Sequence, residues 1–396
     1  MRMQPVNNEQ ASVQLFEHTL SSGFVVAEAR LNSESTLNSL SLEMIEILDQ
    51  ALRNWAAEDG VVAVVLTAAG DRAFCAGGDI QALYYAMVRN REVGECVDDY
   101  PYSFFESEYR LAHLLHLYAK PVIAIGQGIV MGGGLGLFSA VDFRVVTERT
   151  RIAMPEVTIG LFPDAGATWL LRNLPAHVAL FLAMTGSQIN AEDALAIGVA
   201  THQLAAVDIP EFRDKLLALA WRGESAADAG LIDDCLQTCA PDHSKSAHQG
   251  STSARPHLVH SSDLHLDCLP ETVTLQPRLS EVVAQLRALR GVSPWVDAGL
   301  ATLDRGCPCT VGIIHEQLLR ARSLSLADCF RLEMTVATHC ADRHDFMEGI
   351  RALLIEKDNS PSWLFGNLES LPQGYVTAHF AEPWPQNPLQ DLEDLQ

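Results

Sequence analysis

Basic residues are scarce in this chain of 396 residues. It contains 27 Lys and Arg against 50 Asp and Glu, which gives a formal net charge of −23. A surface this acidic repels phosphodiester backbones and anionic lipids. Nucleic acids and membrane surfaces are therefore not expected as partners. A small anionic ligand is not excluded, because it needs only a local patch of hydrogen-bond donors.

The nine cysteines include no CxxC pair. The nearest neighbours are Cys307 and Cys309, and then Cys235 and Cys239. An odd number at these spacings predicts neither a disulfide framework nor a zinc site. We expect reduced thiols, no metal, no redox cofactor and a cytoplasmic protein.

Long apolar runs are also rare. The first ten residues, MRMQPVNNEQ, contain no apolar stretch of signal length and no arginine-rich leader. The segment 121–141 is uncharged and long enough to cross a bilayer, but it holds six glycines. The chain as a whole has a globular composition, with 48% hydrophobic residues. We therefore interpret the segment 121–141 as a buried strand, a glycine turn and a buried helix.

Strand and helix patterns alternate through the first half of the chain. Two alternating runs, 13–20 and 24–31, predict a hairpin, and Ser39 or Ser41 opens an amphipathic helix that ends near residue 58. The valine-rich run 61–67 predicts a fully buried strand. Repetition of this cycle indicates an α/β fold with right-handed crossovers.

The pattern changes after residue 224. We divide the chain into an α/β core (1–224), a variable linker or loop region (225–277) and a helical C-terminal region (278–396). Five histidines between residues 243 and 265 show no metal-binding spacing, so a solvated loop is expected there. The acidic tail from Glu382 contains no Lys or Arg, which predicts disorder.

Two glycine-rich loops follow predicted strands. The first is Phe-Cys-Ala-Gly-Gly-Asp at 74–79, where Asp79 can cap the next helix, and the second is Met-Gly-Gly-Gly-Leu-Gly at 131–136. Such loops at helix starts present unpaired amides. If they converge, one amide from each forms an oxyanion hole. The alternative is an ordinary glycine turn, and neither loop has a phosphate-binding spacing.

A third segment, 154–166, carries Glu156 and Asp164 among apolar residues. Burial raises the pKa of a carboxyl group and suits it to proton transfer or nucleophilic attack near neutral pH. Asp164 also suits a helix N-cap. For Glu156 the structural alternative is a buried ion pair.

The order and spacing of these three segments resemble the crotonase (enoyl-CoA hydratase/isomerase) superfamily, and more narrowly its 3-hydroxyisobutyryl-CoA hydrolase branch. The resemblance covers residues 24–204 and resumes at Glu333-Met334, 344–358, Pro361 and Trp363. It implies a crotonase-like ββα spiral core with a helical C-terminal region that binds an acyl-CoA.

By this resemblance the oxyanion amides fall on Gly78 and Gly133, and the catalytic carboxylates on Glu156 and Asp164. Glu108 takes an acidic substrate-contacting position, although from the residues alone it is a solvated helix charge. The remaining substrate-binding positions are Ala76, Gly77, Asp79 and Gly132.

The implied activity is hydrolysis of an acyl-CoA thioester, 3-hydroxyisobutyryl-CoA in valine catabolism, with CoA entering only as part of the substrate. Glu156 would attack the carbonyl carbon or act as base toward water, and Asp164 would hold the substrate's hydroxyl or orient that water.

Two other functions stay open. An enoyl-CoA hydratase or isomerase is the first, but hydratases of this superfamily carry a second Glu where Gly136 stands and usually Gly at the position of Asp164. A non-catalytic CoA-binding protein is the second. Ala167 and the run Cys307-Pro308-Cys309-Thr310 depart from the branch and bear on acyl specificity. Trimers are common in the superfamily, so a homo-oligomer is also open.

Overall fold

Two sheets form the core of the computed structural model, which describes residues 10–241 and 264–394. The larger sheet has the order β1-β2-β3-β5-β7-β9, in which only β1 and β2 are antiparallel. Its strands are Val13–Thr19, Val25–Leu31, Val61–Ala68, Val122–Gly126, Phe143–Val146 and His202–Gln203. The smaller, parallel sheet contains β4 (Ala73–Cys75), β6 (Ile129–Met131) and β8 (Arg151–Ala153).

Each repeat of the spiral adds one strand to the larger sheet and one strand to the smaller sheet. β3 precedes β4, β5 precedes β6 and β7 precedes β8, so the pairs of strands repeat along a spiral. The residues of β3 and β5 are almost entirely buried, as uninterrupted apolar runs require in a parallel sheet covered on both faces. The predicted ββα spiral and the N-terminal hairpin are confirmed.

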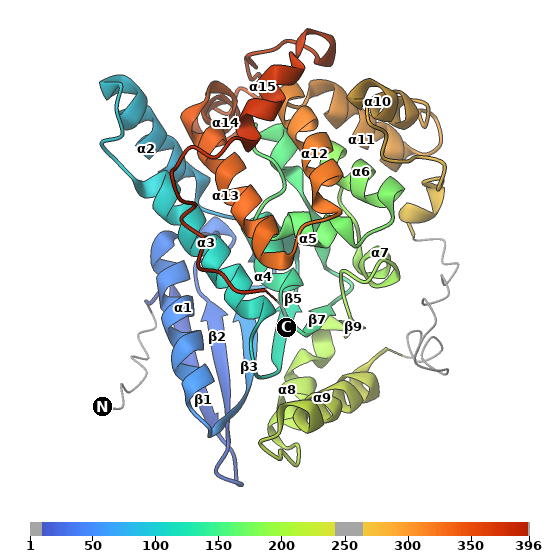
Figure 1. The fold of residues 1–396 in the computed structure, drawn as a ribbon. Helices are drawn as coiled ribbons and strands as arrows, with labels where there is room; N and C mark the ends of the chain where they lie inside the picture. Colours follow the sequence, from blue (N-terminus) through green and yellow to red (C-terminus); the bar gives the residue numbers. More distant parts are fainter. Residues whose placement is uncertain (1–9, 242–263, 395–396) are drawn as a thin grey trace.

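Helices cover both faces of the larger sheet (Figure 1). α1 (Leu42–Ala57) begins where the Ser41 hydroxyl accepts a hydrogen bond from the Met44 N–H at 3.2 Å, and it packs against α3 (Tyr100–His116). α8 (Ile209–Leu217) and α9 (Ser225–Cys239) cover the opposite face. Residues 225–239, expected in the linker, are therefore a helix. Its apolar positions Ile232 and Leu236 are fully buried against the sheet.

Several short helices connect the core strands. They are α2 (Ile80–Val93), α4 (Gly133–Ser139), η2 (Pro155–Thr158), α5 (Ala167–Arg172), α6 (Ala176–Thr185) and α7 (Ala191–Ala196). The segment 121–141 forms β5, β6 and α4, as expected. Within the described ranges, no helix has the length and apolar character needed to span a bilayer.

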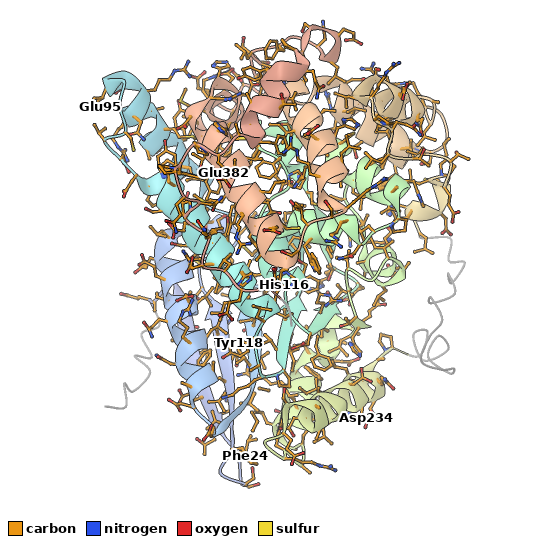
Figure 2. All side chains as sticks on the ribbon, viewed as in Figure 1. Phe24, Glu95, His116, Tyr118, Asp234 and Glu382 are labelled. Atoms are coloured by element: carbon orange, nitrogen blue, oxygen red, sulfur yellow. The ribbon has the colours of Figure 1, made fainter. Side chains whose placement is uncertain are left out.

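The C-terminal region is helical, as predicted. It contains α10 (Leu279–Arg287), α11 (Pro294–Arg305), α12 (Pro308–Ala321), α13 (Leu326–Asp342), α14 (His344–Ile350), the π-helical η5 (Arg351–Ile355) and α15 (Gln373–Thr377). α13 packs on α3, α12 on α5 and α11 on α6. One cluster of buried apolar side chains runs through the core and these helices, and side chains fill the space between them (Figure 2).

The acidic tail is ordered as far as residue 394, which contradicts the predicted disorder. Arg110 of α3 forms an ion pair with Asp391 at 2.9 Å, and Arg331 of α13 donates to the Leu392 carbonyl at 2.6 Å. Asp394 accepts a hydrogen bond from the Ala327 N–H at the start of α13. The tail lacks its own cations but lies along two helices that supply them (Figure 1).

Candidate active site

The two glycine loops meet in the core. Gly77 and Gly132 both have positive φ angles, +114° and +51°, which favour glycine. A Cβ placed on Gly132 would lie 3.3 Å from the Cα of Gly77, so the backbones of the two loops are in contact. The spiral therefore brings together loops that are more than fifty residues apart in the sequence.

Each loop offers one free amide. Gly133 is the first residue of α4, and an N–H at that position has no acceptor within its own helix. Gly78 is fixed on both sides, because Leu40 N–H donates to Gly77 O and Asp79 N–H donates to Leu40 O, each at 2.8 Å. Within the described chain neither the Gly78 nor the Gly133 N–H donates a hydrogen bond. Two free donors on touching loops fit an oxyanion hole.

Glu156 and Glu108 face these loops. The Oε1 atom of Glu156 would lie 3.6 Å from a Cβ on Gly132, and a Cβ on Gly133 would overlap Oε1 of Glu108. Both side chains are more than nine-tenths buried. Oε2 of Glu156 and Oε1 of Glu108 have no hydrogen-bond partner in the described structure. Two buried oxygens therefore remain free for a substrate or a water molecule.

Asp164 completes the carboxylate cluster. Its Oδ2 accepts a hydrogen bond from the Tyr109 hydroxyl at 2.7 Å, and its side chain is buried. It does not cap the following helix: the N-cap of α5 is Gly166, without a side-chain cap bond. Burial raises the pKa of Asp164 to about 6, although the Tyr109 hydrogen bond works in the opposite direction.

The other two carboxyl groups are also perturbed. Burial raises the pKa of Glu156 well above its usual range, and the charge of Asp164 raises it further. Burial likewise raises the pKa of Glu108, with additional repulsion from Asp164, Glu333 and Glu156. Among the described residues no cation forms an ion pair with Glu156 or Glu108, so the ion-pair alternative for Glu156 fails. Clustered groups of this kind are typical of functional sites.

Ala76 and Asp79, two further predicted site residues, belong to the first loop. The Ala76 N–H donates to Leu37 O at 3.1 Å and so anchors that loop. The Asp79 carboxylate accepts from the Ala82 N–H at 3.2 Å and caps α2, as the sequence predicted. The Asp79 carboxylate therefore caps α2 and is not part of the cluster formed by Glu108, Glu156 and Asp164.

Sequence reasoning missed three polar residues around this cluster. They are Tyr109, Gln317 and Glu333, all buried. Tyr109 directly follows Glu108 in the sequence, and Glu333 lies in the part of the C-terminal region that resembles the hydrolase branch. Gln317 gives no local signal, because its partners lie about 150 residues away.

Gly136 leaves no room for a second glutamate. A Cβ there would lie 2.6 Å from the carbonyl oxygen of Ala165 and 2.8 Å from its Cβ. Any side chain at this position of α4 requires the 164–166 turn to move. The paired carboxylates that the resemblance associates with hydration are therefore sterically disfavoured.

The whole chain is similar to known acyl-CoA enzymes. The family model for enoyl-CoA hydratase/isomerase matches residues 26–380. The 3-hydroxyisobutyryl-CoA hydrolase of Gallus gallus is 31% identical, with coverage of 95% of this chain and 94% of the relative. That of Dictyostelium discoideum is 32% identical, with coverage of 92% and 90%.

Solved structures share the complete fold. The structure described as a carnitinyl-CoA dehydratase from Mycobacterium thermoresistibile has a TM-score of 0.77 and 30% identity, covering 96% of this chain and 99% of that one. The structure described as an enoyl-CoA hydratase from Rhodobacter sphaeroides has a TM-score of 0.76 and 29% identity, covering 94% and 98%.

These comparisons correct one expectation and confirm another. The curated relatives are named as mitochondrial proteins, so the expected cytoplasmic location is wrong. Reduced thiols and the composition of the first residues are not specific for one compartment, so they do not determine the location. The resemblance seen in the motifs is confirmed over nearly the full length. The chain belongs to the enoyl-CoA hydratase/isomerase family and, within it, to the branch of the 3-hydroxyisobutyryl-CoA hydrolases.

Proposed function

We propose that this protein hydrolyses 3-hydroxyisobutyryl-CoA to 3-hydroxyisobutyrate and CoA, a step of valine catabolism. The observation that carries the proposal is the unpartnered, buried Oε2 of Glu156 beside two loops with free amides, with no room for a second glutamate at Gly136. The identity of the acyl group in this proposal is taken from the curated relatives, which are named 3-hydroxyisobutyryl-CoA hydrolases.

The thioester carbonyl oxygen would accept hydrogen bonds from the N–H groups of Gly78 and Gly133. Negative charge develops on this oxygen during attack, and one such donor stabilises the transition state by about 3 kcal/mol. Because the donors are backbone amides fixed by neighbouring hydrogen bonds, they need no reorganisation when the charge forms.

Glu156 would supply the nucleophile or the base. In the first route its carboxylate attacks the carbonyl carbon, the C–S bond breaks, and CoA leaves as the thiolate. Water then hydrolyses the mixed anhydride and restores Glu156. In the second route Glu156 accepts a proton from water, which attacks the carbonyl directly. Both routes use the same free carboxylate oxygen.

Asp164 and Glu108 would bind the polar end of the substrate. Tyr109 fixes one oxygen of Asp164, which leaves the other to accept from the substrate's hydroxyl or from the attacking water. The free Oε1 of Glu108 lies against Gly133, close to the thioester carbonyl in this arrangement. CoA enters with the substrate, and no other cofactor takes part in the proposed reaction.

Parallel assays on one preparation test this function. Thiol release from 3-hydroxyisobutyryl-CoA is followed beside hydration of crotonyl-CoA, with wild type and the Glu156→Gln variant. Thiol release that disappears in the variant, with negligible hydration, supports the hydrolase. Hydration without thiol release would instead establish an enoyl-CoA hydratase, the activity named in the description of the Rhodobacter sphaeroides structure.

A further inference from the structure

Glu333 of the C-terminal helix α13 reaches into the turn that follows Asp164. Its Oε2 accepts a hydrogen bond from the Gly166 N–H at 2.7 Å, and its Oε1 accepts from the Thr168 N–H at 2.8 Å. The side chain is completely buried. Glu333 therefore performs at the start of α5 the capping that Asp164 does not perform.

Gln317 of α12 holds the same turn from its other end. Its amide nitrogen donates to the Pro163 carbonyl and to the Thr168 hydroxyl, each at 2.7 Å. Pro163 directly precedes Asp164 in the chain. The turn 163–168 is therefore fixed on both sides of the catalytic carboxylate, in each case by a buried side chain of the C-terminal region.

The turn needs such support because its backbone is strained. Ala165 has a φ of +52°, in the left-handed region that residues with a Cβ rarely adopt. This conformation destabilises the folded chain unless neighbouring groups hold it. Ala165 also lies directly against Gly136 of α4. Without the four hydrogen bonds, the turn would relax and displace the Asp164 side chain from Tyr109.

We propose that Glu333 and Gln317 are positioning residues, which hold the turn 163–168 so that the Asp164 carboxylate stays in its productive place beside Tyr109. The inference rests on the function proposed above. It assigns the C-terminal region a part in the chemistry: α12 and α13 each supply one side chain that places a catalytic group without touching the substrate.

Two opposing effects act on the Glu333 carboxyl group. Burial raises the pKa of Glu333 to about 8, while the hydrogen bonds from Gly166 and Thr168 lower it, and the charge of Asp164 raises it again. A neutral side chain could cap the start of α5 without placing a second buried acid next to Asp164. Both oxygens of Glu333 accept backbone N–H groups, and these hydrogen bonds favour the carboxylate form against the burial that raises its pKa.

Two isosteric substitutions test the proposal. Glu333→Gln places an NH₂ group against a backbone N–H, and Gln317→Glu places a carboxylate against the Pro163 carbonyl. Neither changes the side-chain volume. For both we expect a fall in kcat of at least tenfold for thiol release, with KM within twofold of wild type. We also expect a shift of the acidic limb of the pH profile, because Asp164 is no longer held at Tyr109.

Matched controls lie on the same helices. Asp328→Asn on α13 and Glu316→Gln on α12 remove carboxylates that pair with arginines at the molecular surface. These controls should keep wild-type kcat, KM and pH profile. If the isosteric variants do not fold, the milder variant Thr168→Val replaces them. It removes only the hydroxyl that Gln317 binds, and should lower kcat by about threefold.

The outcomes separate this inference from the proposed function. Variants that lose thermal stability but retain wild-type kcat and pH profile would show that the two residues are purely structural, and would overturn the proposal. If the wild type releases no thiol, the proposed function fails. The positioning role is then tested by amide hydrogen exchange at Gly166 and Thr168, which should be faster in Glu333→Gln; unchanged exchange would overturn it.

Discussion

Glu108, Glu156 and Asp164 are buried carboxyl groups, and none of them forms an ion pair with a described cation. Such groups destabilise a folded chain, because burial removes the hydration of the charge. All three lie around the two glycine loops or the turn next to them. The arrangement is therefore understandable as a site whose free oxygens are satisfied only when substrate or water is present.

Replacement of Glu156 by Gln is the sharpest test at this scale. The substitution keeps the volume of the side chain but removes its negative charge, so nucleophilic attack and base catalysis are both lost. We expect thiol release to fall by at least 100-fold, while substrate binding measured by calorimetry changes little. A rate within twofold of wild type would remove Glu156 from the mechanism.

The raised pKa of Asp164 predicts a pH-dependent effect on stability. The pKa is about 6 in the folded protein against 3.8 for the free side chain, so the folded state binds the proton more tightly. Its stabilising contribution is complete below pH 4 and is lost as the pH rises through 6. Asp164→Asn, which can still accept from Tyr109, should raise Tm by about 2 °C at pH 8. At pH 4 it should change Tm little, and an equal increase at both values would contradict the assignment.

The sequence allowed Glu156 and Asp164 to be singled out because their neighbours in the chain are apolar. Glu108 could not be identified in this way. It lies on a helix between Glu106 and Arg110, which point outward and pair with each other. The burial of Glu108 depends on how α3 packs against the glycine loops and α13. That packing is tertiary and leaves no local signal, so only the family resemblance marked this residue.

At the scale of elements, α4 and the turn 163–168 are in direct contact through Gly136 and Ala165. Gly136→Ala should overpack this contact and lower the free energy of unfolding by about 1–3 kcal/mol, measured by urea titration. It should also slow thiol release, because Asp164 belongs to the displaced turn. Gly230 in α9 is the matched control: its Cβ position is open, so Gly230→Ala should stabilise the protein slightly. Equal effects of the two substitutions would contradict the contact.

Most elements of the core were predictable from periodicity and capping residues, as for α1 with Ser41 and α2 with Asp79. Two segments were not. Helix α9 has a weak apolar pattern of its own and is stabilised by burial of Ile232 and Leu236 on the sheet. The acidic tail is ordered by arginines far away in the sequence. In both cases the deciding interactions are made with other elements.

At the scale of the molecule, the C-terminal helices and the catalytic segment form one packed unit. The Cys307 N–H donates to the Val157 carbonyl at 2.9 Å, one residue after Glu156. Gly349 of α14 lies so close to the Ile159 backbone that no Cβ would fit there. Because the hydrophobic cluster is also continuous, the C-terminal region supports the active site and is not an independent appendage.

Removal of residues 382–396 tests this coupling. The truncation deletes Leu389, which is fully buried, and the Asp394 carboxylate that binds the Ala327 N–H of α13. It also leaves Arg110 and Arg331 without their partners in the tail. We expect Tm to fall by several degrees.

Thiol release should fall as well, because α13 carries Glu333. The variant Arg110→Gln removes one anchor only and should produce a smaller part of the same effect, with little further change when it is combined with the truncation. Fully additive effects would show that Arg110 stabilises the protein independently of the tail. A truncated protein with unchanged Tm and rate would show that the tail contributes nothing to α13 or to the site that α13 supports.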